Sequence, residues 1–245
     1  MSGETHDTTG FLYEIGLLKR YPRTGWALAG VPAAESVAEH SFRASIIAAT
    51  LAAAEDADPQ RAAFLALWHD TQETRTTDLP HLTKRYVTTA TNQTVTGDQV
   101  RPLPPPVAAM ISGAVSEYEA GETPEAICAR DADKLECLLQ AREYQDHGHQ
   151  NLQPWIDSSL ASLHTATAKQ LASEALTQNS LEWLQHAQRA LPGCHRLRRG
   201  SRALPPPTPS RLSRSEAGAY TGRSCATRPK RRPASNLVVT ATVFL

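Results

Sequence analysis

Two histidines and three aspartates in the first part of the chain have types and spacings that could hold a metal ion. His40 stands near the start of one expected helix, and His69 and Asp70 stand at the end of another. Asp131 and Asp133 open a third, apolar helix. Two imidazoles and two carboxylates can bind one octahedral divalent cation and leave two positions for water and substrate. The sequence therefore suggests a divalent-metal site.

Two further acids, Glu73 and Asp78, follow the His69-Asp70 pair closely. Glu73 lies three residues after Asp70, so both would face the same side if the helix continued. Taken singly, each of these residues has an ordinary structural explanation, since an aspartate at a helix start is usually a cap. Their order and spacing along the chain are what favour a common site.

Helical periodicity predicts the elements that would position these side chains. Ser36 and Glu39 have the spacing of a capping box, which starts a helix over residues 36–54. Asp58 and Pro59 are an N-cap and a first-turn proline, and they start a helix over 60–70. One face of the first of these helices carries Phe42, Ile46, Ala49 and Ala53.

Further helices are expected on either side of these two. They cover residues 11–20, 107–120, 124–147 and 160–190, the last in one or two pieces. Residues 23–32 and 87–106 are expected to be loops because glycine, threonine and proline are frequent there. No run of alternating β-branched residues competes with this pattern, so the predicted fold class is all-α.

The zero net charge of the 245-residue chain hides two segments of opposite charge. Residues 192–245 contain eleven Lys and Arg residues and a single acid, Glu216, which leaves the first 191 residues acidic. The basic segment is rich in Arg, Pro, Ser and Ala, and it cannot bury enough apolar surface to offset its ordering entropy. We therefore expect one domain over residues 1–191 and a disordered basic tail over 192–245.

The sequence gives no reason to expect a membrane or an oxidising compartment. Residues 1–10 are polar and unlike a signal peptide, and no apolar run in the body approaches the roughly 20 residues of a membrane-spanning helix. The four cysteines show no C-x-x-C spacing, which argues against a disulfide framework or a zinc ribbon. We expect a cytoplasmic protein with no membrane partner.

Taken in order, these residues resemble a known family. Residues 37–43 (VAEHSFR), 67–70 (LWHD) and 131–136 (DADKLE) carry the histidines and aspartates, and Glu73 and the Asp78-Leu79-Pro80 run lie between them. The combined pattern resembles the HD-domain metal-dependent phosphohydrolases and, within them, the 5′-deoxynucleotidase branch. It covers about residues 11–190 and is far more specific than a His-Asp pair alone.

The resemblance implies a helical bundle around one principal divalent ion, which would be Mn²⁺, Co²⁺ or Mg²⁺. The implied ligands are His40, His69, Asp70 and Asp133, and Asp131 is the less expected of the two acids because the family aspartate directly follows an alanine. The implied reaction is removal of phosphate from deoxynucleoside 5′-monophosphates. Relatives of this kind are commonly dimeric, so a homodimer is expected.

Glu73 and Asp78 are the expected catalytic residues. Glu73 is assigned to water activation or proton transfer. Asp78 could protonate the leaving 5′-oxygen, bind the sugar hydroxyls, or join Glu73 at a second metal ion, and these alternatives stay open. Asp78 is also expected to bind substrate together with Leu79 and Pro80.

Arg23 and Trp26 are the remaining expected substrate-binding residues. The guanidinium of Arg23 matches a phosphate in a bidentate manner. The ring of Trp26 could close against the sugar or the base, where an aromatic face would disfavour a 2′-hydroxyl. The alternative for Trp26 is simple packing in the core.

Two other functions compete with the nucleotidase. Guanosine-tetraphosphate hydrolases share the fold but carry H-D-x-x-E-D, where this chain has Thr74 in place of the last acid. A non-catalytic protein that binds nucleotides or nucleic acid through its basic tail would show binding that weakens steeply with salt. Metal-dependent phosphate release from mononucleotides would separate the enzyme from the binding protein.

Overall fold

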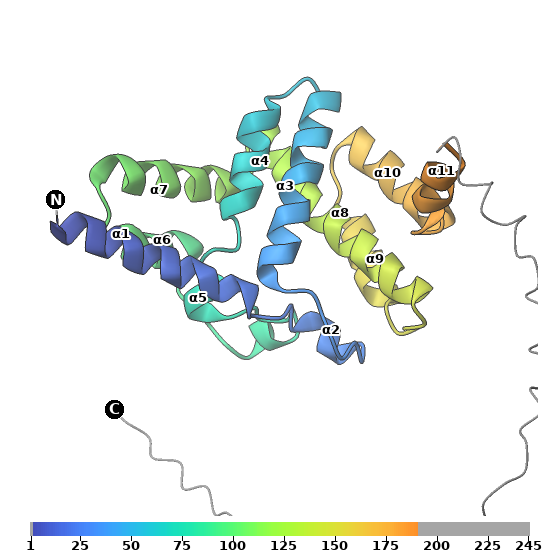
Figure 1. Ribbon diagram of the computed structural model, residues 1–245, viewed down its shortest axis with the longest axis horizontal. Helices are drawn as coiled ribbons and strands as arrows, with labels where there is room; N and C mark the ends of the chain where they lie inside the picture. Colours follow the sequence, from blue (N-terminus) through green and yellow to red (C-terminus); the bar gives the residue numbers. More distant parts are fainter. Residues whose placement is uncertain (1, 191–245) are drawn as a thin grey trace, which may run out of the picture. The chain divides into compact units, whose positions relative to one another are not determined.

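The structure is a computed structural model that describes residues 2–190, and within that range it is helical with no β-strand (Figure 1). The all-α prediction is therefore confirmed for the described residues, and no helix among them is long and apolar enough to cross a membrane. The predicted disorder of the tail over 192–245 lies outside the described residues. The helices are α1 (Ser2–Ile15), η1 (Gly16–Lys19), α2 (Gly25–Leu28), α3 (Val37–Ala54), α4 (Pro59–Trp68), α5 (Glu73–Thr76), η2 (Thr83–Arg85), α6 (Asn92–Val100), α7 (Pro105–Ala120), α8 (Pro124–Asp146), α9 (Gln153–Ala161), α10 (Ala166–Thr177) and α11 (Glu182–Ala190).

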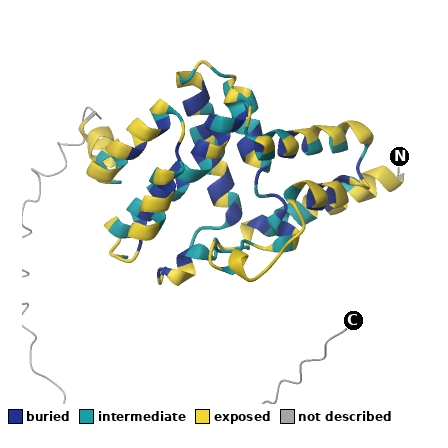
Figure 2. Ribbon diagram, turned by 180° about the vertical axis from the view of Figure 1, so that it is seen from behind, coloured by how far each residue is buried: buried dark blue, intermediate teal, exposed yellow. Residues whose placement is uncertain are grey.

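Helices α3, α4 and α8 pack on one another at the centre of the fold, with α7 against α4 and with α9 and α10 against α8 (Figure 1). Their buried faces are dark blue in Figure 2. Alanine dominates the contact surfaces of the three central helices. The fully buried alanines are Ala44, Ala48 and Ala52 of α3, Ala62 and Ala66 of α4, and Ala126, Ala129, Ala132 and Ala141 of α8. Such small side chains let the helix backbones approach closely; we call this set the alanine seam.

Local capping signals fix where α3 and α4 begin. The Ser36 side chain accepts a hydrogen bond from the Glu39 backbone N–H, and the Glu39 carboxylate accepts one from the Ser36 backbone N–H, which completes the predicted capping box. The Asp58 side chain accepts from the first two available backbone N–H groups of α4, and Pro59 occupies the first turn. Both predicted starts are confirmed.

The larger apolar side chains of α3 are not on its buried face. Phe42 and Ile46 are 67% and 52% exposed. The face that packs against α4 and α8 instead carries Val37, His40, Ala44, Ala48 and Leu51. Alanine takes the core positions because α4 and α8 lie so close, and this leaves the larger side chains on the outer face.

The segment 87–106 is not one long loop as predicted. It contains α6, whose first turn is capped by the Thr91 hydroxyl accepting from the Thr94 backbone N–H. The buried face of α6 is half polar, since Thr96 and Gln99 lie on it beside Val95. A hydrophobic pattern could not reveal a helix whose inner face makes hydrogen bonds rather than apolar contacts.

The short helix α2 (Gly25–Leu28) lies inside the predicted loop over 23–32, and two other predicted boundaries also move. The first helix begins at Ser2 rather than at residue 11 and continues to Ile15 before the short η1. The predicted helix over 160–190 consists of α10 and α11, separated by residues 178–181, and its first residues belong to the end of α9. Neither change moves the segments that carry the candidate site.

Candidate metal centre

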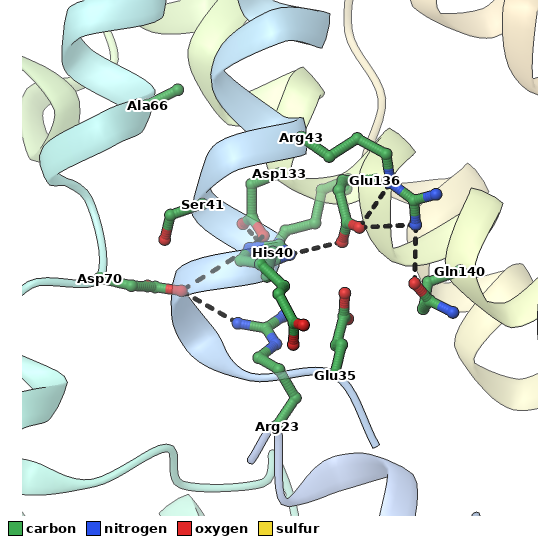
Figure 3. Close-up of polar contacts among 12 residues, drawn as sticks. Arg23, Glu35, His40, Ser41, Arg43, Ala66, Asp70, Asp133, Glu136 and Gln140 are labelled. Atoms are coloured by element: carbon green, nitrogen blue, oxygen red, sulfur yellow. Dashed lines mark hydrogen bonds and ion pairs between the residues drawn. The ribbon is translucent and has the colours of Figure 1, made fainter. Parts of the chain in front are cut away.

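The four residues expected to bind metal come together in the structure although they are distant in sequence. Figure 3 shows His40 of α3, Asp70 just after α4 and Asp133 of α8 converging, and His69 joins them. The His40 Nε2 atom lies 3.3 Å from the His69 Nε2 atom and 3.3 Å from Asp133 Oδ1. His69 Nε2 lies 3.1 Å from Asp70 Oδ2 and 3.9 Å from Asp133 Oδ1.

The separations among His40, His69 and Asp133 fit a donor set for one divalent ion, and Asp70 Oδ2 lies beside the two histidines. Ligand atoms at about 2.1 Å from an octahedral ion lie about 3 Å apart when adjacent and about 4 Å apart when opposite. The donor atoms of His40, His69 and Asp133 all lie within 4.8 Å of one another. Two imidazole nitrogens and two carboxylates are also the ligand chemistry of such ions.

Each histidine is held by the ring nitrogen that faces away from the cluster. His69 Nδ1 lies 2.6 Å from the Ala66 carbonyl oxygen, one turn back in α4. His40 Nδ1 lies 2.5 Å from Glu136 Oε2. A proton on each Nδ1 would satisfy these contacts and would leave the lone pair of each Nε2 directed into the cluster, as a metal ligand requires.

The electrostatics of the cluster favour bound positive charge. Burial alone would raise the pKa of Asp70, but His69, Arg23 and His40 outweigh burial and hold that pKa well below its usual range. Burial and the Arg23 charge oppose protonation of His40, yet its hydrogen bonds to Asp133 and Glu136 outweigh them and raise its pKa to about 10. The raised pKa of His40 and the lowered pKa of Asp70 both reflect the excess of negative charge in the cluster. A divalent ion bound there would take the place of the proton on His40 Nε2.

The structure separates the two candidate aspartates of α8. Asp131 is fully buried, but its carboxylate accepts hydrogen bonds from the backbone N–H groups of His164 and Thr165 at 2.9 and 2.7 Å. It also accepts one from the Thr165 hydroxyl at 2.7 Å. Asp131 therefore holds the start of α10, and Asp133 is the aspartate in the cluster.

A cleft of about 510 Å³ opens beside this cluster. All the residues expected to act on substrate line it: Arg23, Trp26, Glu73, Asp78, Leu79 and Pro80. Asp70 and Asp133 contribute to its inner wall. Arg23 donates a hydrogen bond from Nη1 to Asp70 Oδ2 at 3.0 Å, so its guanidinium stands next to the donor cluster (Figure 3).

Glu73 faces the cleft in an unusual electrostatic state. Burial is the main cause that raises its pKa to about 9, and the negative charges of Asp70 and Asp78 raise it further. Its Oε2 atom has no hydrogen-bond partner within the described part of the chain. A partly buried carboxyl group with an uncommitted oxygen and a raised pKa is suited to hold or move a proton.

Asp78 is fixed to the segment that carries Arg23. Its Oδ2 atom accepts a hydrogen bond from the Thr24 backbone N–H at 2.5 Å, and the Thr24 hydroxyl lies 2.7 Å from the Asp78 carbonyl oxygen and 3.0 Å from Oδ2. This pairing joins the loop before α2 to the loop after α5. The Thr24 contacts therefore hold Asp78 beside the segment that carries Arg23, and both residues line the cleft.

Trp26 is mainly a core residue. It is only 2% exposed, its Nε1–H donates to Glu35 Oε1 at 3.0 Å, and its ring meets Tyr144 edge-on with centroids 5.4 Å apart. Trp155 of α9 lines the same cleft and is less deeply buried, with its ring 5.9 Å from that of Trp26. A Cβ atom at Gly25 would lie 3.3 Å from Trp155 Nε1, so glycine permits this close approach.

Three charged residues at the site had no role in the sequence prediction. Lys134 lines the cleft and donates to Asp133 Oδ2 at 2.8 Å. Glu136 and Glu35 approach His40 from the side opposite the cluster (Figure 3). Sequence position could have indicated two of them, because Lys134 directly follows the expected ligand Asp133 and Glu136 comes one helical turn after it.

Comparison with known proteins gives the family. The HD domain profile matches residues 15–175. The 5'-deoxynucleotidase HDDC2 of Dictyostelium discoideum is 32% identical over 185 residues, which is 66% of this chain and 93% of that protein. The 5'-deoxynucleotidase HDDC2 of Homo sapiens is 30% identical over 178 residues, or 69% of this chain and 85% of that protein.

A solved structure agrees with these matches. The predicted metal-dependent phosphohydrolase from Magnetospirillum magnetotacticum is 25% identical, covers 76% of this chain and 94% of its own, and superposes with a TM-score of 0.54. The chain therefore belongs to the HD domain family. Its similarity to proteins named 5'-deoxynucleotidase confirms the resemblance to that branch and supports a hydrolase.

Proposed function

We propose that this protein is a metal-dependent 5′-deoxynucleotidase that converts deoxynucleoside 5′-monophosphates to deoxynucleosides and phosphate. The observation that supports this best is the convergence of two imidazoles and two carboxylates beside a cleft that also holds Arg23 and Glu73. The deoxynucleotidase relatives, matched over most of their length, support the substrate class.

The proposed metal ligands are His40, His69, Asp70 and Asp133. A bound divalent ion would supply Lewis acidity towards the phosphoryl group. The preferred ion is proposed to be Mn²⁺, Co²⁺ or Mg²⁺, which the mixed nitrogen and oxygen donor set accommodates.

Arg23 is proposed to bind the phosphate. Its guanidinium already lies 3.0 Å from Asp70, so a phosphate seated against the cluster would come within reach of its N–H groups. Lys134, which donates to Asp133 Oδ2, adds a second cation to the cleft wall. These two cations offset the acidity of the site for an anionic substrate.

Glu73 and Asp78 are proposed to handle protons and to orient the sugar. Glu73 has the raised pKa and the free Oε2 atom that suit proton transfer with water. Asp78 is held by Thr24 and, with Leu79 and Pro80, lines the cleft, where it can bind sugar hydroxyls or the leaving 5′-oxygen. Trp26 supports this wall from the core, and Trp155 offers an aromatic surface near it.

The competing functions fit less well. In a guanosine-tetraphosphate hydrolase the position of Thr74 would be an acid, whereas here the Thr74 hydroxyl interacts with Glu14 at 2.9 Å and the Thr71 carbonyl oxygen at 3.1 Å. A binding protein would not need the cluster of buried acids and histidines. The tail on which a nucleic-acid function would depend lies outside the described residues.

A panel of mononucleotides tests the proposal. Phosphate release from deoxyribo- and ribonucleoside 5′-monophosphates is measured with Mn²⁺, Co²⁺ and Mg²⁺, and we expect metal-dependent turnover that is faster for the deoxy series. His69→Ala should abolish it, while His147→Ala, at the end of α8 and outside the cleft, should not. No turnover with any of the three ions would overturn the proposal.

Three properties of the whole protein are proposed with it. We propose a catalytic domain over residues 1–191, a cytoplasmic location and a homodimer. The exposed Phe42 and Ile46 of α3 offer apolar surface that a second copy could cover. Light scattering after size-exclusion chromatography measures the oligomeric state, and a mass of one chain at micromolar concentration would exclude the dimer.

A further inference from the structure

We propose that Glu136, clamped by Arg43, is the positioning residue that fixes the tautomer and orientation of His40. This inference rests on the proposed metal site and adds to it a residue that binds neither metal nor substrate. Figure 3 shows the chain of contacts running from the cluster through His40 to Glu136, Arg43 and Gln140.

The geometry of His40 requires such a partner. The imidazole is fully buried, and its Nε2 atom faces Asp133, Asp70 and His69. To act as a ligand, Nε2 must be free of its proton, so the proton of the neutral ring must sit on Nδ1. Glu136 Oε2 lies 2.5 Å from Nδ1 and accepts that proton's hydrogen bond.

Glu136 is itself held in place by charge and by two hydrogen bonds. It is fully buried, and its Oε1 atom accepts from Arg43 Nε at 2.9 Å and from Nη2 at 2.8 Å. The same guanidinium donates to Gln140 and to Glu143. Because a guanidinium can only donate hydrogen bonds, both contacts require Glu136 Oε1 to act as an acceptor.

The sequence spacing on α3 and α8 couples the Arg43–Glu136 pair to the His40–Asp133 pair. Arg43 follows His40 by three residues on α3, and Glu136 follows Asp133 by three residues on α8. Residues three apart lie on the same helical face. Each helix therefore presents one cluster residue and, one turn further on, one member of the clamp, so the contact between α3 and α8 positions both together.

His69 provides an internal comparison. Its Nδ1 faces the Ala66 backbone carbonyl, which can only accept a hydrogen bond, so its tautomer is fixed by the main chain. Among the described residues His40 Nδ1 has no backbone partner, and it depends on the Glu136 side chain. Glu35 also approaches His40, but its carboxylate accepts from Trp26 Nε1.

Glu136→Gln tests the proposal sharply because Arg43 dictates which way the amide turns. Arg43 can only donate, so the new carbonyl oxygen should face it and the NH₂ group should face His40 Nδ1. That contact would force Nδ1 to accept, placing the proton on Nε2, the nitrogen needed for the metal. We expect the Kd for Mn²⁺ to rise by roughly 10–100-fold, the range for loss of an outer partner of a metal ligand.

Removing the clamp in the same variant should restore binding. In Arg43→Met/Glu136→Gln nothing forces the amide orientation, so the carbonyl oxygen can turn to His40 and the Kd should recover in part. The control is Glu143→Gln, which contacts Arg43 but not His40 and should change the Kd by less than about threefold. The Kd is measured on the full chain by competition with a fluorescent chelator, and the Co²⁺ absorption spectrum reports the ligand geometry.

The outcomes separate the two proposals. If His40→Ala leaves the Mn²⁺ Kd unchanged, the metal site itself is wrong. If His40→Ala weakens binding but Glu136→Gln leaves the Kd and the Co²⁺ spectrum unchanged, the positioning role is overturned. A lower unfolding temperature for Glu136→Gln with an unchanged Kd would assign Glu136 a purely structural role. If Glu136→Gln does not fold, Arg43→Met alone, on a partly exposed residue, serves as the test, and an unchanged Kd there would count against the clamp.

Discussion

Replacing Glu73 with glutamine should abolish turnover and at the same time stabilise the metal-free protein, by an amount that grows with pH. Burial, together with the charges of Asp70 and Asp78, raises the pKa of Glu73 from 4.5 to about 9. Between these two values the folded protein keeps a proton that the unfolded chain releases. In this pH range, keeping Glu73 protonated lowers the free energy of unfolding of the native state. Glutamine resembles the protonated acid and does not lower it.

The sign and size of the effect follow from this difference in pKa. Since the folded-state pKa is the higher one, the contribution of Glu73 to stability is fully present below pH 4.5 and is lost as the pH rises towards 9. Each pH unit inside the window corresponds to about 1.4 kcal/mol. At about pH 7.5 the upper limit is thus about 4 kcal/mol, and partial solvent access to Glu73 reduces the expected gain to about 2 kcal/mol.

Urea-induced unfolding, followed by circular dichroism in the presence of a chelator, measures this gain. The free energy of unfolding of Glu73→Gln should exceed that of the wild type by about 2 kcal/mol near pH 7.5 and by well under 1 kcal/mol near pH 5. The control is Glu122→Gln, an exposed position outside the site, where no pH-dependent difference is expected. A variant no more stable than the wild type, or a gain independent of pH, would refute the assigned burial of this charge.

Three further predictions concern the surroundings of the site. Arg23→Met should raise KM for a deoxynucleotide by roughly tenfold or more, because a charge-assisted contact to phosphate contributes about 1.5–3 kcal/mol; steady-state kinetics across substrate concentrations would show it. Asp131→Ala should lower the free energy of unfolding by about 1–3 kcal/mol, because the hydrogen bonds that hold the start of α10 are lost. The Mn²⁺ Kd should stay unchanged in this variant, whereas Asp133→Ala should weaken Mn²⁺ binding. Deleting residues 192–245 should leave kcat/KM within about twofold of the full chain while removing any salt-sensitive DNA binding measured by filter retention.

Local signals in the sequence were sufficient to predict the start of α3 and α4 and the class of fold. The capping box at Ser36 and the Asp58-Pro59 start act through hydrogen bonds within one turn, so neighbouring residues determine them. Local signals did not predict the helix α6 over residues 92–100. Gln99 donates to the Thr71 carbonyl oxygen and lies within hydrogen-bond distance of the Thr74 hydroxyl, and such partners from a distant segment make a polar face the inner one.

The site was predictable in its residue types but not in its supporting contacts. The order of the histidines and aspartates selected four residues that the structure brings together. The place of Trp155 beside Gly25, and the clamp of Arg43 on Glu136, depend on how α9 packs near α2 and how α8 packs on α3. Contacts of this kind form only when helices that are distant in sequence pack together. Local sequence patterns therefore cannot predict them.

The alanine seam constrains the metal centre through the size of the side chains between the helices rather than through the identity of the ligands. His40 and Asp133 sit on α3 and α8, which pack on each other and carry the fully buried alanines Ala44, Ala48 and Ala132. One added isopropyl group at any of these positions would act as a spacer and widen a donor gap that is now 3.3 Å, without altering a single ligand. Substitutions along the seam should therefore be tolerated only when they introduce glycine, alanine or serine. A larger side chain there would reduce activity because it increases the distance between the helices that carry the ligands.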